Sequence, residues 1–346
     1  MTIPAPYLLY LGHSDDEVGI KTSRGLAAFR REDCVGEWRH DDSPLTLGLP
    51  RMDAAAAHAA GARTLVLGIA NAGGRLGEAL IRDALVAITT GMNIASGLHN
   101  RLRDEPRLVA AAEQAGVRLF DVRDAPADLP VGNGRRRAGN RLLTVGTDCS
   151  VGKMYTTVAL RDALLARGVE ADFRATGQTG ILIAGSGIPL DAVVADFISG
   201  AVETLAPARD DDGWDLIEGQ GSLFHPSFAG VSTGLLHGAQ PAAIVMCHDP
   251  SRAHMRGLPH YDLPDLETCL EANLRVARLT SPDVAAVGIA LNTVKLGEDE
   301  ARRLCADTAD RLGLPATDPH RFGADPIADR LLQCFAPSKP ATTVFA

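Results

Sequence analysis

The sequence has few aromatic residues, no closely paired cysteines and no long apolar run. Aromatic residues make up 4% of the chain, and its six cysteines stand far apart with no C-x-x-C pair. This spacing gives no sign of a zinc site or a disulfide framework. No segment reaches about 18 uninterrupted apolar residues, and no basic region precedes an apolar stretch at the N-terminus. We therefore expect a cytoplasmic protein with no membrane partner.

The composition is typical of a soluble α/β enzyme. Hydrophobic residues make up 46% of the 346 residues and charged residues 22%, with 35 glycines. A chain of this length can bury two cores of ordinary size, so we expect two domains. The net charge of -9 argues against a nucleic-acid-binding surface. The expected partners are a small-molecule substrate and other copies of the chain in a homo-oligomer.

The segment V-G-T-D-C-S-V-G-K, residues 145–153, has the features of a phosphate-binding loop. Residues 142–145 precede it as a predicted strand, and residues 154–167 follow as a predicted helix. Main-chain N–H groups at the start of such a helix attract phosphate oxygens, and we expect an exposed Lys153 to reach the same phosphates. The residues expected to hold a phosphorylated cofactor are Gly146, Thr147, Asp148, Cys149, Ser150, Val151, Gly152, Lys153 and Met154.

Two departures from the usual phosphate-loop pattern narrow the choice of ligand. Five residues separate Gly146 from Gly152, one more than usual, and Met154 stands where a serine or threonine normally holds Mg²⁺. Thr156 and Thr157 lie too far along to replace that hydroxyl simply. The wider spacing resembles the dethiobiotin synthetase group of P-loop proteins. The missing hydroxyl favours a loop that grips a phosphorylated cofactor without a metal over one that splits ATP.

A polar connection at residues 132–140, G-N-G-R-R-R-A-G-N, divides the sequence into two halves. Strands alternate with helices on both sides, so we expect a Rossmann-like parallel-sheet domain over residues 1–139 and a P-loop parallel-sheet domain over residues 140–346. Glycine-rich residues 68–76 do not match the dinucleotide-binding spacing, which favours a scaffold turn or a turn that faces the main ligand from the neighbouring domain. The first half contains predicted strands at 7–11, 64–69 and 117–122, and a predicted helix at 108–115.

Polar residues follow each predicted strand of the second half. In an open parallel sheet, ligands bind beyond the carboxyl ends of the strands, so we expect these residues to converge on the phosphate loop. The strands at 169–175, 215–217, 242–246 and 286–291 lead, respectively, into T-G-Q-T-G at 176–180, E-G-Q-G-S at 218–222, Cys247 and His248, and Asn292.

Four motifs together resemble a bacterial P-loop family formerly of unknown function. They are the phosphate loop, G-L-H-N at residues 97–100, T-G-Q-T-G-I-L-I-A-G-x-G-I-P-x-D-A-V-V-A-D-F at 176–197, and E-G-Q-G-S-L-x-H-P at 218–226. The resemblance extends over nearly the whole chain. The family includes D-glutamate and D-aspartate N-acetyltransferases of the DgcN type. The resemblance therefore implies an N-acetyltransferase that uses acetyl-CoA and a D-amino acid.

Acetyl transfer to an amine needs a base, an oxyanion donor and cations that hold the substrate carboxylates. Glu218 and His225 are the predicted bases, and Lys153 is the third expected catalytic residue. Simpler interpretations stay open, because Glu218 could pair with Lys153, and His225 could cap local backbone. His248 could belong to a turn with Asp249. The candidate substrate-binding residues are Arg174, Gln178, Thr179, Asp196, His248 and Asn292, and Arg252 and Arg256 are further candidate carboxylate clamps.

The route of transfer and the reaction class have alternatives. A thiolate at a helix N-terminus is stabilised, so Cys149 could carry the acetyl group covalently. No histidine lies in the same segment to act as its base, and direct attack of the amine on the thioester is the simpler route. The chain could instead be an ATP-dependent ligase or kinase of the dethiobiotin synthetase kind, with Glu218 and Asp148 holding Mg²⁺, or a non-catalytic nucleotide sensor. Met154 favours CoA over ATP.

Overall fold

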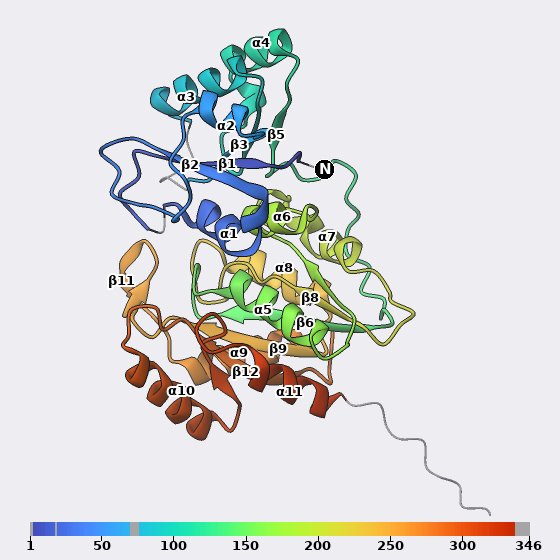
Figure 1. Cartoon of the computed structure of the whole chain (residues 1–346). Coiled ribbons are helices and arrows are strands. Elements are labelled where there is room, and N and C mark those ends of the chain that lie inside the picture. The colour runs from blue at the N-terminus through green and yellow to red at the C-terminus, as the bar shows by residue number, and fades with distance from the viewer. Residues whose placement is uncertain (1–2, 18, 70–75, 336–346) are drawn as a thin grey trace, which may run out of the picture. The chain divides into compact units, whose positions relative to one another are not determined.

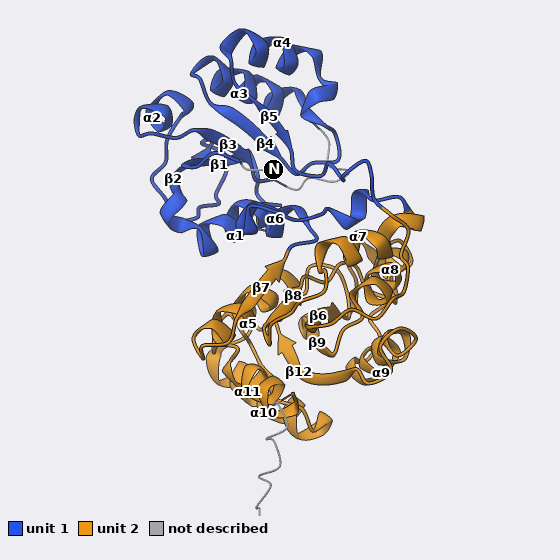
Figure 2. Cartoon of the chain, turned by 90° about the vertical axis from the view of Figure 1, so that its right-hand side faces the viewer, with its two compact units in different colours: residues 1–129, 175–194 blue, residues 130–174, 195–346 orange. Residues whose placement is uncertain are grey.

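The chain folds into two compact units, each built around a parallel sheet (Figures 1 and 2). The computed structural model describes residues 3–17, 19–69 and 76–335, so most of the glycine-rich stretch at 68–76 lies outside the described residues. Unit 1 comprises residues 1–129 and 175–194, and unit 2 comprises residues 130–174 and 195–346. The two parallel sheets confirm the predicted α/β class.

Unit 1 has a five-stranded parallel sheet in the order β2-β1-β3-β4-β5. Apolar side chains from its strands and helices form a large buried core, and Leu11, Ile20 and Leu45 form a smaller cluster. The apolar runs predicted strands at the positions of β1, β3 and β5 but not at β2 or β4. In β2, C-V-G-E-W-R, charged residues interrupt the apolar pattern. The elements are β1 (Tyr7–Gly12), α1 (Lys21–Phe29), β2 (Cys34–Arg39), α2 (Ala54–Ala59), β3 (Thr64–Leu67), α3 (Glu78–Thr89), β4 (Asn93–Ser96), α4 (Pro106–Ala115), β5 (Leu119–Asp121) and α6 (Gln178–Ala184).

Residues 175–194 leave unit 2 after β7 and pack within unit 1. Helix α6 of this segment lies beside α1 (Figure 1), where the hydroxyls of Thr179 and Thr22 are 3.0 Å apart. The Arg30 guanidinium also donates to the Ile183 carbonyl over 2.9 Å. The sequence predicted one boundary between residues 139 and 140, whereas the contacts in the structure divide the chain at residue 129 and again around this segment.

Unit 2 has a six-stranded parallel sheet in the order β13-β12-β9-β6-β8-β7, with helices on its faces, and a separate antiparallel hairpin β10-β11. Its elements are β6 (Asn140–Gly146), α5 (Lys153–Leu165), β7 (Ala171–Arg174), α7 (Ile198–Leu205), β8 (Trp214–Ile217), α8 (Ala229–Ala239), β9 (Ala243–His248), β10 (His254–Met255), β11 (Leu258–Asp262), α9 (Leu266–Ala277), β12 (Ala285–Leu291), α10 (Glu298–Leu312), β13 (Ala316–Thr317) and α11 (Asp325–Cys334).

Strand β6 places the phosphate loop in the middle of the sheet edge of unit 2. It pairs in parallel with β9 on one side and β8 on the other. Leu142 and Leu143, which point to opposite faces, are both fully buried, as expected for a central strand covered by helices on both faces. The chain therefore leaves β6 at the carboxyl edge and enters α5 directly, as the sequence predicted.

None of the helices in the described part of the chain is long and apolar enough to cross a membrane.

Candidate anion-binding and catalytic site

The phosphate loop adopts a strained backbone that presents main-chain donors. Ser150 has a φ of 53° and Gly152 a φ of 103°, and α5 begins at the next residue, Lys153. Among the described residues, the N–H groups of Ser150, Val151 and Gly152 have no hydrogen-bond acceptor. Unpaired N–H groups at the start of a helix form an anion-binding site, and a positive φ at a non-glycine residue is a strained conformation that occurs often in ligand-binding turns. The loop is therefore built to accept an anion.

Lys153 is buried, which corrects the expectation of an exposed lysine above the loop. Its side chain is only 7% exposed, and Nζ donates to the carbonyls of Asp148 and Gly221, each over 2.8 Å. Burial lowers its pKa, an effect that the Cys149 and Asp148 charges oppose. The ammonium therefore links the phosphate loop to the loop that contains Gly221. Its positive charge adds to the electrostatic potential at the loop.

Two arginines bracket the loop from the segment after β9. The fully buried Asp148 carboxylate accepts hydrogen bonds from the Cys149 N–H over 2.6 Å, from the Arg252 guanidinium over 2.9 Å and from the Arg256 N–H over 2.8 Å. Arg252 also donates to the carbonyls of Cys149 and Ser150 over 2.6 and 2.7 Å. The Arg256 guanidinium donates to the Ser150 hydroxyl. The structure thus places both arginines at the anion site, where the sequence had suggested carboxylate clamps.

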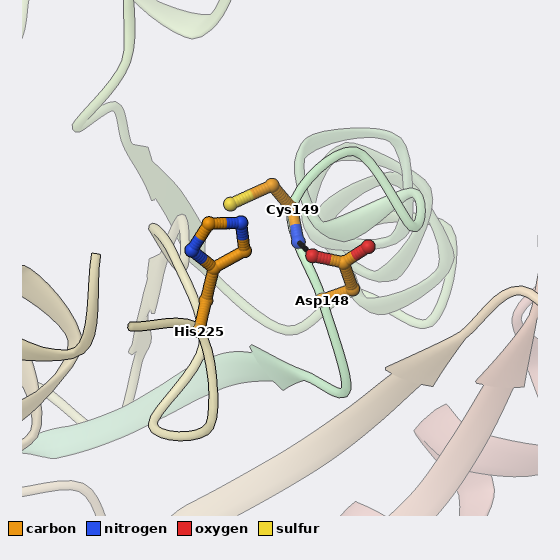
Figure 3. A group of neighbouring side chains, drawn as sticks. All are labelled: Asp148, Cys149 and His225. Carbon is orange, nitrogen blue, oxygen red and sulfur yellow. Dashed lines mark hydrogen bonds between the residues drawn. The ribbon is translucent and has the colours of Figure 1, made fainter. Parts of the chain in front are cut away.

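His225 lies beside the loop but has both ring nitrogens engaged. Its side chain is 2% exposed. Nδ1 accepts from the Ser227 N–H over 3.2 Å, and Nε2 lies 3.2 Å from the Arg256 carbonyl, so the hydrogen is on Nε2. Figure 3 shows Cys149 pointing toward this ring; one ligand atom each of Asp148, Cys149 and His225 lie within 4.8 Å of one another. The two ring contacts of His225 are with main-chain groups, as the alternative role of capping local backbone requires.

Glu218 comes to the loop at the end of β8. Its side chain is 4% exposed, and its N–H donates to the Arg174 carbonyl over 3.0 Å. The next residue must be glycine, because a Cβ at Gly219 would lie 1.8 Å from the Thr144 carbonyl oxygen and 2.9 Å from Lys153 Cδ. Because the main chain at Gly219 packs directly against β6 and Lys153, Glu218 lies next to both.

His248 and Asn292 also reach the loop from neighbouring strands. His248 Nδ1 lies 3.0 Å from the Thr147 hydroxyl, and burial lowers the pKa of this histidine. The Asn292 N–H donates to the His248 carbonyl over 2.8 Å, and a Cβ at Gly152 would lie 4.0 Å from Asn292 Cβ. A pocket of about 350 Å³ opens next to them, lined among others by His248, Arg252, Leu266, Leu291 and Arg311.

The other predicted substrate residues lie elsewhere. Arg174 donates to the buried Asp215 carboxylate over 2.9 Å and also pairs with Asp172, so the strands of unit 2 hold its guanidinium. Asp196 is exposed in a short 3₁₀ turn, Ala195–Phe197. Gln178 and Thr179 belong to unit 1.

Unit 1 holds a second polar cluster that sequence reasoning did not assemble. The Arg123 guanidinium donates to the Gly97 carbonyl over 2.6 Å and to the Gln178 side chain over 3.1 Å, and it also contacts His99 and pairs with Asp191. Burial and the Arg123 charge lower the pKa of His99. Motifs at 97–100 and 176–197 therefore meet around one arginine within unit 1.

Comparison with known proteins identifies the family. A model of a Rossmann-like domain, DUF1611_N, matches residues 32–125, and a model of a P-loop domain, DUF1611_C, matches residues 130–328. The chain is 50% identical over 95% of its length, and 99% of the relative's, to a protein of Tritonibacter scottomollicae named D-glutamate N-acetyltransferase. It is 47% identical to one of the same name from a Pseudoalteromonas species, over 96% of the chain and 100% of the relative.

A solved structure agrees. The chain resembles the crystal structure of a DUF1611 family protein from Anabaena variabilis with a TM-score of 0.88 and 34% identity, over 95% of this chain and 100% of that one. The matched domain models bear out the Rossmann-like and P-loop domains expected from the sequence. The chain therefore belongs to the DUF1611 family, in which a Rossmann-like domain precedes a P-loop domain.

Proposed function

We propose that this chain is an N-acetyltransferase that moves the acetyl group of acetyl-CoA to the amino group of D-glutamate or D-aspartate. The names of its two relatives support N-acetyltransferase activity. The observation that carries the proposal is the phosphate loop, with three adjacent main-chain N–H groups lacking acceptors among the described residues and two arginines beside them. CoA carries phosphates that such a loop can hold.

The donor is proposed to bind without a metal ion. Met154 offers no hydroxyl for Mg²⁺. Thr156 and Thr157 are buried, and the Thr157 hydroxyl donates to the Lys153 carbonyl over 2.7 Å, so it serves α5. The charge of the phosphates would instead face Arg256 and the buried Lys153 ammonium, whereas Arg252 is already paired with Asp148 and Asp249 and holds the loop. The loop amides supply the directional hydrogen bonds.

Two groups beside the loop suit removal of the proton from the substrate ammonium. Glu218 is the buried carboxylate at the end of β8, and a carboxylate is a group that can accept a proton from a substrate. His248 lines the 350 Å³ pocket, and its lowered pKa keeps it neutral at pH 7. His225 is assigned a positioning role instead, because both of its nitrogens are engaged. We propose that the pocket beside His248 binds part of acetyl-CoA or of the amino-acid substrate.

The ligase or kinase alternative requires Glu218 and Asp148 to hold Mg²⁺ on a nucleotide, and the contacts of Asp148 argue against its part. Its two carboxylate oxygens already accept three N–H donors, one from a guanidinium. A cation at the same oxygens would have to displace Arg252 and would be repelled by it. The geometry therefore supports the acetyltransferase over this alternative.

The test is to mix purified protein with acetyl-CoA and a panel of D- and L-amino acids, in EDTA, and to follow release of the CoA thiol. Thiol release that needs D-glutamate or D-aspartate, with the N-acetylated product seen by mass spectrometry, is the expected result. Acetyl-CoA without amino acid is the control for hydrolysis. ATP cleavage that needs Mg²⁺, with no thiol release from acetyl-CoA, would replace the proposal with the ligase or kinase. Saturable CoA binding with no turnover of any amino acid would indicate a sensor.

A further inference from the structure

We propose that the pocket next to His248 binds the amino-acid substrate, and that Arg311 and Thr308 hold its side-chain carboxylate. This assignment rests on the proposed function in taking an acidic amino acid as the substrate. It adds the place where that substrate binds and two residues that select its acidic side chain. The phosphate loop and the two groups suited to act as base leave both of these open.

The pocket lies next to the phosphate loop, and His248 contacts both. Its Nδ1 lies 3.0 Å from the hydroxyl of Thr147, a fully buried residue of the loop, and His248 also lines the 350 Å³ pocket. The other ring nitrogen, Nε2, has no hydrogen-bond partner among the described residues and is not shielded from solvent. The ring thus uses one nitrogen to contact the loop, and the second remains available to the amine of a substrate in the pocket.

One face of α10 lines the pocket with an apolar, a hydroxyl and a cationic side chain. Leu304, Thr308 and Arg311 are spaced by four and three residues, so they lie on the same side of the helix. Thr308 is only 4% exposed, and its hydroxyl has no hydrogen-bond partner among the described residues. By contrast, the hydroxyls of Thr157 and Thr204 donate to the carbonyl four residues earlier in their helices. The Thr308 hydroxyl is therefore available to donate to a ligand in the pocket.

Of the two arginines that line the pocket in the described part of the chain, Arg311 is the one available to a carboxylate. It pairs with Glu267, and the two side chains are 53% and 44% exposed. Exposed ion pairs of this kind are weak, because water solvates both partners and screens their charges. Arg252 instead donates to the buried Asp148 carboxylate and to two carbonyls of the phosphate loop. A substrate carboxylate can thus replace Glu267 on Arg311, whereas Arg252 is held by the loop.

The side chains of the pocket suit an acidic amino acid better than the pantetheine arm of CoA. A guanidinium and a hydroxyl on one helix face can both donate to a carboxylate, and the guanidinium bond is charge-assisted. The pantetheine arm carries no charge and offers no anionic partner to Arg311. Leu266, Leu291 and Leu304 also line the pocket and can pack against the methylene groups of the substrate. The reacting amine has to lie beside His248 and the loop, so the side-chain carboxylate, the charged group farthest from it, contacts α10.

The experiment measures by calorimetry how strongly D-glutamate and D-glutamine bind in the presence of saturating CoA, which requires no turnover. The two ligands differ in the charge of the side chain, so the ratio of their Kd values reports its recognition. In wild type, D-glutamate should bind at least tenfold more tightly. In Arg311→Gln this preference should fall to about twofold or less, through weaker binding of D-glutamate. A preference that is unchanged in Arg311→Gln, or absent from wild type, overturns the assignment.

Two further variants keep the test independent of folding. Thr308→Val keeps the shape of the side chain and removes the hydroxyl, so the Kd for D-glutamate should rise about fivefold. Arg303→Gln is the matched control, because Arg303 is exposed on the same helix and does not line the pocket. It should leave both Kd values unchanged, and thermal unfolding is measured for every variant. An equal rise in the Kd for D-glutamate in Arg303→Gln and Arg311→Gln would show a general charge effect and contradict the assignment.

CoA affinity and thiol release separate this assignment from the proposed function. Arg311→Gln should leave the Kd for CoA within about twofold. A larger rise in that Kd, with the preference for D-glutamate unchanged, would show that the pocket binds the coenzyme. Arg311-dependent binding of D-glutamate in a protein that transfers no acetyl group would contradict the proposed function alone. Acetyl transfer to D-glutamate with full kcat/KM in both Arg311→Gln and Thr308→Val would contradict the pocket assignment alone.

Discussion

The two sheet edges at which the family motifs gather differ in how far their polar groups are satisfied. In unit 2, the amides of residues 150–152 have no acceptor among the described residues, and Arg256 reaches the loop with no carboxylate partner among them. In unit 1, Arg123 is neutralised by Asp191 and also donates to the Gly97 carbonyl and to Gln178. The edge of unit 2 has unpaired hydrogen-bond donors, whereas the polar groups around Arg123 in unit 1 are paired with one another.

This difference teaches which motif residues are ready for a ligand. Motif membership alone treats both edges alike, since both follow parallel strands and both contain basic residues. An anion can bind where donors are unpaired, because it then replaces only water. At the unit 1 cluster it would first have to displace an internal carboxylate. If the contrast holds, substitutions at the edge of unit 2 impair CoA binding or catalysis, whereas substitutions in the Arg123 cluster affect only stability.

The largest effect is expected from Glu218→Gln at the open edge. The change removes a base and keeps the shape of the side chain, so kcat should fall by roughly 100-fold or more, as for loss of a general base. The Kd for CoA should stay within about twofold, since a neutral amide still fits beside the loop. Steady-state kinetics and calorimetry measure the two quantities. If Glu218→Gln keeps full activity and His248→Gln is inactive, His248 is the base and Glu218 is not.

Lys153→Ala should weaken both binding and folding. The Kd for CoA is expected to rise roughly 100-fold, because a cation of the anion site is lost. The free energy of unfolding should fall by about 2 to 4 kcal/mol, because two carbonyls of buried loops lose their donor. Lys295→Ala is the matched control, since Lys295 is exposed after β12. Unchanged CoA affinity in Lys153→Ala would show that the phosphate loop does not bind CoA.

Arg256→Ala and Arg123→Ala test the contrast between the edges directly. Arg256→Ala should raise the Kd for CoA roughly tenfold, the effect of one charge-assisted hydrogen bond, with little change in stability. Arg123→Ala should lower the free energy of unfolding by about 1 kcal/mol and leave the Kd for CoA within about twofold, since its charge is already paired. Calorimetric titration and thermal unfolding of both variants give the four numbers. The reverse pattern would show that the closed cluster is the CoA site.

How much of this was visible in the sequence depends on the range of each interaction. The phosphate loop was found because strand, glycines, lysine and helix follow one another within a short stretch. The burial of Lys153 was missed because its acceptor at Gly221 lies in a different loop. The pairing of Arg174 with Asp215 could not be predicted, because Asp215 is on a strand 41 residues away. The place of residues 175–194 in unit 1 likewise depends on contacts with α1, which local patterns do not encode.

The smallest effect concerns pH and His248. Its pKa is lowered by burial, so it stays neutral in the folded protein at a pH at which the unfolded chain takes up a proton. Its contribution to stability is therefore present above about pH 6.5 and is lost as pH falls below that value. His248→Gln should flatten this part of the stability curve in urea unfolding between pH 5 and 7. An unchanged slope would mean that His248 titrates alike in both states.

The central claim is that the phosphate loop holds CoA without a metal ion, and calorimetric titration of CoA into wild-type protein in excess EDTA tests it most directly. The account predicts saturable binding with one site per chain and no gain in affinity when Mg²⁺ replaces EDTA. Binding that disappears in EDTA and returns with Mg²⁺ would contradict it.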